Sequence, residues 1–306
     1  MLNEFWKSVA SKLGDRWAAT AGPALVFWIG GLLVWAVSGG GPWPLDTVSG
    51  WISEQATVVQ VAVLIAALCG VVASGIVVRR LGDPVLRLME GYWPRWAAAV
   101  RRRRVQSVAE AKRRRSARLR ELAPVVRGGG GTSEEQGEFI RLDRERRRVP
   151  SAEARLMPTR IGNVLRAGES RPADKYGLDL VAVWPQWWLV LPDTARQELL
   201  AARGALDSAV GAVVWGTAFI GFAPLAWWAA PAGFLVAVAA WRSWVPRHAE
   251  AFSDLLEATA DVHRWDLYEK LRWPRPQSPA QEREFGRRLT MYLVRGSDED
   301  DPTFTE

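Results

Sequence analysis

Residues 58–78 read VVQVAVLIAALCGVVASGIVV and residues 23–37 read PALVFWIGGLLVWAV, and neither stretch contains a charged side chain. The charge-free windows around these two stretches run for 24 and 29 positions. A helix needs about 20 apolar residues to cross roughly 30 Å of hydrocarbon, so both windows predict membrane-spanning helices. The earlier window is too long and too rich in Trp to be the apolar part of a cleavable signal peptide.

A third charge-free window covers residues 208–241 and would be about 51 Å long as one helix at a rise of 1.5 Å per residue. That length exceeds one ordinary span, and Pro224 and Pro231 interrupt the window near its middle. We therefore predict a transmembrane hairpin of two short helices, 207–224 and 228–244. One span followed by a re-entrant segment is the alternative that the length leaves open.

The distribution of basic residues predicts the orientation of these helices. The segment 39–55 contains no Lys or Arg, whereas residues 79–208 contain 27 and the region after residue 241 contains 10. Because basic loops stay on the cytoplasmic side, the short loop is expected outside and both termini inside. The sequence thus predicts an all-α, polytopic helical membrane protein with both termini on the cytoplasmic side. It has four transmembrane helices and a mainly helical cytoplasmic portion.

Composition excludes several classes of site. The chain has 40 Lys and Arg against 33 Asp and Glu, but only one Cys and two His. A disulfide framework, a Cys-rich zinc module and a multi-histidine metal centre are therefore excluded. Trp is unusually frequent, with 18 residues against 4 Tyr, and this side chain favours membrane interfaces. The expected interfacial anchors are Trp93, Trp96, Trp184, Trp187, Trp188, Trp227, Trp228, Trp241 and Trp244. Burial between helices is the alternative for the three around Pro185.

Helix signals and changes of composition divide the chain. Asp83 and Pro84 predict the start of an interfacial helix that Pro94 bends, and Asp193 predicts a helix that continues into the third window. Ser278 predicts a last helix, which Gly296 ends. The predicted segments are an amphipathic helix 1–17, two spans with a short external loop 18–80, the interfacial helix and a basic cytoplasmic stalk 81–127, a flexible Gly-rich linker 128–133, a cytoplasmic region 134–206, the hairpin 207–244, cytoplasmic helices 245–296 and an acidic disordered tail 297–306.

The basic stalk predicts an interaction with anionic lipid headgroups. Residues 101–120 contain ten basic side chains and one acidic one. A juxtamembrane cluster of this kind gains about 1 kcal/mol per basic residue close to an anionic surface. The expected lipid-binding residues are Arg101, Arg102, Arg103, Arg104, Lys112, Arg113, Arg114 and Arg115. A solvated helix that only enforces topology is the alternative, and nucleic acid is unlikely because no aromatic side chain interleaves the run to stack bases.

A ladder of small residues lies on the second window. Ala62, Ala66, Gly70 and Ser74 follow one another at steps of four, a pattern that lets membrane helices approach closely. The ladder predicts either packing against another span of the same chain or the interface of a homo-oligomer.

Catalytic constellations are missing from the sequence. His248 and His263 lie among charged residues, where a solvated or salt-bridged histidine is usual. Asp261, His263 and Asp266 are spaced so that they do not share one face of a helix, and no phosphate-binding loop or metalloprotease motif occurs. Cys69 lies in the middle of a span, where it is expected to pack. We expect no enzyme activity, no cofactor and no metal.

Four stretches carry a resemblance to a known family. They are residues 14–31, Met157–Arg166, Tyr176–Asp179 with Trp184 and Pro185, and Glu282–Thr290. Together they resemble uncharacterised bacterial, actinobacterial-type, multi-pass integral membrane proteins. The resemblance implies a membrane fold and carries no activity to this chain.

These observations predict a non-catalytic integral membrane protein that acts in membrane docking, anchoring or as an effector. Its cytoplasmic helices would receive a protein partner or a signal. The alternative is an oligomeric pore that conducts ions or perturbs the membrane. Small-residue faces and a cytoplasmic sensor suit both functions, so the sequence leaves the choice open.

Overall fold

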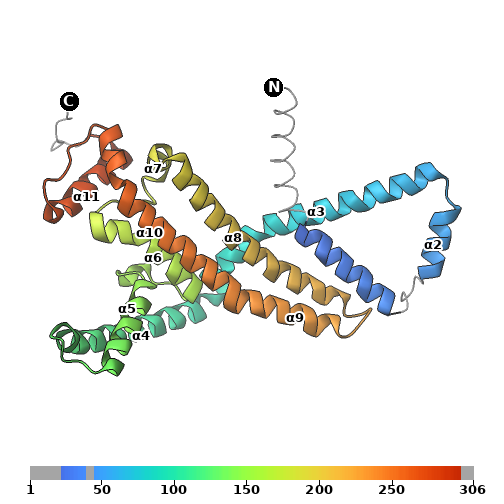
Figure 1. Cartoon of the computed structure of the whole chain (residues 1–306), viewed down its shortest axis with the longest axis horizontal. Coiled ribbons are helices and arrows are strands. Elements are labelled where there is room, and N and C mark those ends of the chain that lie inside the picture. Colours follow the sequence, from blue (N-terminus) through green and yellow to red (C-terminus); the bar gives the residue numbers. More distant parts are fainter. Residues whose placement is uncertain (1–21, 39–44, 298–306) are drawn as a thin grey trace. The chain divides into compact units, whose positions relative to one another are not determined.

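The computed structural model describes residues 22–38 and 45–297, and these residues form helices and turns without a strand (Figure 1). The all-α fold class is therefore confirmed for the described part of the chain. Two helical stretches, Thr57–Arg127 and Asp193–Phe222, are long and apolar enough to cross a membrane, while the apolar helix Gly22–Val37 is shorter. The predicted amphipathic helix 1–17 and the acidic tail after Ser297 lie outside the described residues.

The chain divides into two compact units. Unit 1 contains the described residues of Met1–Leu86 and Asp207–Val245, and unit 2 contains those of Arg87–Leu206 and Pro246–Glu306. Three of the predicted segment boundaries, 80/81, 206/207 and 244/245, lie near the divisions between the units at 86/87, 206/207 and 245/246.

Unit 1 consists of apolar helices that meet through aromatic rings. The helix Gly22–Val37 packs against α8 (Asp193–Phe219) and the 3-10 turn η3 (Ile220–Phe222), where the Phe27 ring lies 4.7 Å from Trp215 and 5.3 Å from Phe222. The backbones approach closely because Gly30 and Gly31 face Phe219 and Phe222; a Cβ at Gly31 would lie 2.5 Å from the Phe222 ring.

Helix α3 (Thr57–Glu90) contributes to both units, and it corrects one prediction. The chain does not start a new helix at Asp83, because α3 continues through Pro84 and ends at Glu90. A proline removes one backbone donor, and the helix continues where the other hydrogen bonds remain. The break falls at Gly91, whose φ of +106° suits glycine and whose Cα faces the Pro158 ring. Within the segment expected as a short loop, residues Leu45–Glu54 form helix α2.

Two glycines bring α8 and α9 (Ala229–Ala239) together in unit 1. A Cβ at Gly233 would lie 2.5 Å from the Gly216 carbonyl oxygen, and one at Gly216 would lie 2.7 Å from the Ala237 nitrogen. Without side chains at this crossing, the two backbones approach as small residues allow in membrane helices. Helix α8 begins at Asp193, as predicted, and α9 continues through the π-helix Ala240–Trp244 into α10 (Val245–Lys270).

In unit 2 the basic segment folds back on itself. Helix α4 (Ala98–Arg127) follows the short 3-10 helix η1 (Arg95–Ala97) and packs against α5 (Ser133–Arg147) through the buried side chains of Leu119, Leu122 and Leu142. The residues predicted as a flexible linker form the turn between these helices. The Gly128 N–H donates to the Pro124 carbonyl at 3.0 Å, and Gly129 adopts a φ of +73°. Glycine suits this turn because it adopts positive φ angles without strain. A Gly-rich composition had instead indicated a flexible linker.

The main core of unit 2 joins helices from distant parts of the sequence. It contains side chains from α7 (Trp184–Val190), α10 and α11 (Pro279–Arg295), with Trp187, Leu267 and Leu289 completely buried. Trp184 and Trp188 are partly buried and pack against the same core. Trp187 is therefore not an interfacial anchor, and the alternative of burial between helices is correct for it.

Glycines also set three crossings around α6 (Arg160–Tyr176). Gly162 lies against the Glu90 carbonyl, Gly168 against Ser253 of α10, and Gly177 against Gly286 of α11. A Cβ at Gly286 would lie 2.0 Å from the Tyr176 carbonyl oxygen. Three of the four stretches that carry the family resemblance thus contain backbone crossings that larger residues would block.

Candidate functional site

The eight basic residues predicted to bind lipid fall into two groups on α4. In the second group, Arg113 forms an ion pair with Glu153 at 2.8 Å and Arg115 one with Glu145 at 3.2 Å. Lys112 donates to the Pro150 carbonyl at 2.8 Å and also to the Ser151 carbonyl. Lys112 and Arg113 thus hold the chain between α5 and α6, and Arg115 contacts α5 itself. Arg114 makes only a long contact of 3.9 Å with Glu110 and is exposed.

The first group, Arg101–Arg104, is different. All four side chains are exposed, and none forms an ion pair with an acidic side chain of residues 22–38 or 45–297. Trp96, one turn before the group, is 86% exposed, whereas Trp93 is partly buried and donates from its indole nitrogen to the Leu88 carbonyl at 2.9 Å. The beginning of α4 therefore presents four unneutralised charges next to a large exposed aromatic ring.

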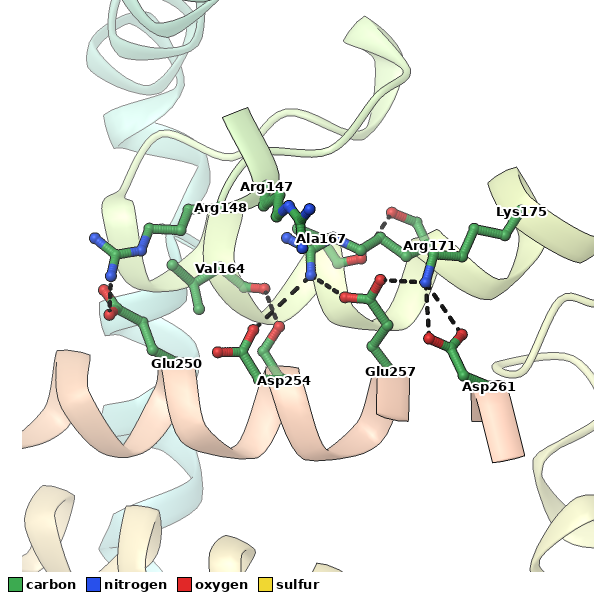
Figure 2. A network of polar contacts seen from close by, with 12 residues as sticks. Arg147, Arg148, Val164, Ala167, Arg171, Lys175, Glu250, Asp254, Glu257 and Asp261 are labelled. Atoms are coloured by element: carbon green, nitrogen blue, oxygen red, sulfur yellow. Dashed lines mark hydrogen bonds and ion pairs between the residues drawn. The ribbon is translucent and has the colours of Figure 1, made fainter. Parts of the chain in front are cut away.

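An acidic stripe on α10 holds unit 2 together (Figure 2). Glu250, Asp254, Glu257 and Asp261 recur at steps of four, three and four residues, so they share one face of the helix. Basic residues that lie before and along α6 contact this face. Their ion pairs are Arg148–Glu250 at 2.6 Å, Arg160–Glu250 at 2.8 Å, Arg171–Glu257, Lys175–Glu257 at 2.7 Å and Lys175–Asp261 at 2.8 Å.

Sequence reasoning missed this network, although a signal for it was present. Opposite charges at helical spacing on two separate segments, Arg171 with Lys175 and Glu257 with Asp261, indicate two faces that match. The pairing itself joins residues 86 positions apart, so no local window of sequence contains both partners.

Two partly buried carboxylates lie in unit 2 near the end of α3. Burial raises the pKa of Glu169, and the negative charge of Asp179 adds to this effect while Arg166 opposes it. Burial likewise raises the pKa of Glu90, and Glu169 raises it further. Protonation of either group is therefore easier than at the protein surface.

The remaining predicted residues lie as follows. Ala62, Ala66 and Gly70 are exposed on α3, and a Cβ at Gly70 would meet no atom of the described chain within 4 Å. Ser74 is partly buried and accepts a hydrogen bond from the Trp28 indole nitrogen at 3.0 Å. The anchors Trp227, Trp228, Trp241 and Trp244 are 79%, 37%, 51% and 48% exposed.

The histidine prediction is confirmed for His263, whose Nδ1 lies 2.8 Å from a carboxylate oxygen of Asp266. Among residues 22–38 and 45–297, no group of three or more His, Cys, Asp and Glu side chains is arranged to hold a metal ion. The one cysteine, Cys69, is exposed on α3 and forms no disulfide.

Comparison with known proteins gives no neighbour: no protein-family model, curated protein or solved structure matches the chain. The resemblance to actinobacterial-type membrane proteins therefore stays an expectation that rests on four stretches of sequence.

Proposed function

We propose that this chain is a non-catalytic, four-span integral membrane protein of a bacterial inner membrane. In this proposal unit 2 is cytoplasmic, docks on anionic lipid headgroups through the beginning of α4, and receives a protein partner or a signal. The observation that carries the proposal is the row Arg101–Arg104, which is exposed and has no acidic partner in the described chain.

The contrast within α4 supports this role. Lys112, Arg113 and Arg115 are engaged by α5 and the chain after it, so the expected lipid-binding surface shrinks to the first group. Four arginines close to an anionic membrane would contribute about 1 kcal/mol each. The exposed Trp96 ring adds an amphipathic side chain of the kind that is enriched at membrane interfaces.

The four-span topology is part of the proposal. Helix Gly22–Val37 has 16 residues, about 24 Å, and the uncharged residues 17–21 precede it in the sequence. The apolar run from Trp227 to Trp241 would be about 22 Å as a helix, a short span that a bilayer accommodates by local thinning. With an even number of spans, the basic regions before and after the hairpin are on the same side, as the charge rule requires.

The docking surface is tested with the full chain in nanodiscs. A spin label at Val100→Cys in a Cys69→Ala background reports whether the beginning of α4 enters the interface. We expect burial of the label in discs that contain phosphatidylglycerol, and its release at 1 M salt, where screening shortens to about 3 Å. Replacing Arg101–Arg104 by Gln should abolish burial, and replacing them by Lys should retain it. Equal burial in neutral phosphatidylcholine discs contradicts docking by charge.

Topology is tested separately by cysteine labelling of the same Cys69→Ala background. An impermeant reagent should label a cysteine at Ser49 in intact cells and one at Ser297 only after permeabilisation. Labelling of both positions in intact cells is incompatible with four spans.

A pore is the second candidate, and the uncovered ladder on α3 favours it. Ala62 and Ala66 are exposed and a Cβ at Gly70 would meet no atom of the described chain within 4 Å, so a second copy could cover this face. Single-channel recording of the purified protein in a planar bilayer, together with its mass in detergent, tests this function. Conductance that Gly70→Leu abolishes would support the pore, and a silent monomer would eliminate it.

A further inference from the structure

A basic cleft lies inside unit 2, apart from the beginning of α4. It has a volume of about 540 Å³ and lies between α4, the end of α5 with the chain that follows it, α6, α10 and α11. Pockets for small molecules usually measure about 300–1,000 Å³, so the cleft has a suitable size. Seven basic and three acidic side chains line it, an excess of four positive charges.

Several of these cations are already neutralised inside the protein. Arg171 and Lys175 share Glu257, and Arg115 pairs with Glu145. Arg146 and Arg147 both pair with Asp143, at 2.7 and 3.4 Å, so Lys112 and Arg283 are the lining cations that remain without such a pair in the described chain.

Two cations of the cleft have no carboxylate within ion-pair distance in the described chain. Arg283 projects from the first turns of α11 and is exposed. Lys112 donates two hydrogen bonds, to the carbonyls of Pro150 and Ser151, so a third N–H of its ammonium group remains available. Desolvation lowers the pKa of Lys112, and the negative charges of Glu153 and Asp174 oppose this effect only in part.

One acceptor in the cleft is also unused. Oxygen Oδ2 of Asp174 is buried and has no hydrogen-bond partner among the described residues, and the hydroxyl-bearing residues Ser116 and Ser151 line the same cleft. A buried carboxylate oxygen is stabilised by a donor such as a ligand hydroxyl. No aromatic side chain lines this cleft, so it offers no ring on which a nucleobase could stack.

We propose that the cleft binds a phosphorylated polyol, with the phosphate on Lys112 and Arg283 and a hydroxyl of the ligand donating to Asp174. A soluble sugar phosphate and the headgroup of phosphatidylglycerol share this chemistry. The cleft does not include Arg101–Arg104, so this proposal can be tested independently of the proposed docking surface.

The soluble source is tested by calorimetry on the full chain in phosphatidylcholine nanodiscs, with glucose 6-phosphate, inorganic phosphate and glucose as probes. We expect glucose 6-phosphate to bind more tightly than phosphate, and glucose alone not to bind. Arg283→Gln should weaken binding about tenfold, the effect of one charge-assisted hydrogen bond. Asp174→Ala should remove the preference for the sugar phosphate over inorganic phosphate. The control with Arg101–Arg104 replaced by Gln should bind as the unchanged chain does.

The lipid source is tested by native mass spectrometry of the same variants in detergent with added phosphatidylglycerol or phosphatidylcholine. Retention of phosphatidylglycerol that Arg283→Gln reduces, and that Arg288→Gln on the same helix but outside the cleft leaves unchanged, identifies the headgroup as the ligand. Arg283 is exposed and unpaired in the described chain, so its variant should keep the melting temperature of the unchanged chain. Failure of both probes to bind, or binding indifferent to both Arg283→Gln and Lys112→Met, overturns the proposal.

Discussion

The helices of the two units are held together by different kinds of contact. In unit 1 only 11% of the most apolar window of the α3 stretch is buried, and its helices meet at glycines and aromatic rings. In unit 2 the large apolar side chains are enclosed in a core, and a stripe of carboxylates on α10 pairs with basic residues. A protein in water hides apolar surface and pairs its buried charges, whereas a protein in lipid can leave apolar surface exposed. The difference supports the proposal that unit 1 lies in lipid and unit 2 in water.

Trp187 and Trp227 give the sharpest contrast, since both were expected at a membrane interface. Trp187 is completely buried in unit 2 and Trp227 is 79% exposed in unit 1. Trp187→Ala should lower the free energy of unfolding by about 3–5 kcal/mol, because it leaves a large cavity. Trp227→Ala should change it by less than about 0.5 kcal/mol. Denaturant unfolding in micelles, followed by circular dichroism, measures both. Equal losses would mean that the two side chains share one environment.

The ion pairs of unit 2 are expected to matter where they are buried. Arg171 and Glu257 have side chains only 14% and 16% exposed. Glu257→Gln removes the carboxylate from both Arg171 and Lys175, and we expect a loss of about 2 kcal/mol, below the range for fully buried pairs because some solvent reaches the site. The matched control is Glu284→Gln on α11, whose carboxylate is 54% exposed and whose loss should cost under about 1 kcal/mol. Thermal unfolding at low and high salt separates them, and a loss no larger than the control's would show that the stripe is not structural.

The glycine crossing of unit 1 is expected to resist even one added methyl group. Gly233→Ala places a Cβ 2.5 Å from the Gly216 carbonyl oxygen, so the helices must separate at a cost of about 1–3 kcal/mol. The control is Gly211→Ala on α8, whose added Cβ meets no atom of the described chain within 4 Å and should stabilise the helix by about 0.5–1 kcal/mol. Melting temperatures in detergent should therefore move in opposite directions. A shift of the same sign for both variants would remove the crossing as the reason for Gly233.

The smallest expected effect is a dependence on pH in unit 2. Burial raises the folded-state pKa of Glu169 above its ordinary 4.5, so its protonated form favours folding at low pH, and this contribution is lost as pH rises through the raised pKa. Glu169→Gln should therefore become more stable relative to the unchanged chain between about pH 4 and pH 7.

Glu138 is the matched opposite for this test. A hydrogen bond from Arg118 lowers its pKa, so its contribution is present above the ordinary pKa and is lost as pH falls. Glu138→Gln should therefore become less stable relative to the unchanged chain as pH rises. Unfolding curves at several pH values test both signs, and parallel behaviour of the two variants contradicts the assignment.

The sequence by itself determined the all-helical class, the apolar windows and the position of the basic run. Each of these features depends on composition within a short window of sequence. The free energies of burial in lipid and of attraction to an anionic surface are sums of contributions from single residues. The helix that begins at Asp193 was predictable for the same local reason, since capping involves only neighbouring residues.

Only the tertiary structure decided which basic residues remain free of intrachain ion pairs and can bind a ligand or a membrane. Arg118 meets Glu138 across 20 positions and Arg171 meets Glu257 across 86, so the sequence could not show that part of the basic surface is already neutralised. The same reason explains Gly128–Gly131, which composition interprets as a flexible linker and the packing of α4 on α5 fixes as a turn. The burial of Trp187 and the presence of the cleft around Arg283 could not be predicted for the same reason. Both depend on contacts between distant segments, and a local sequence pattern contains only the residues of one segment.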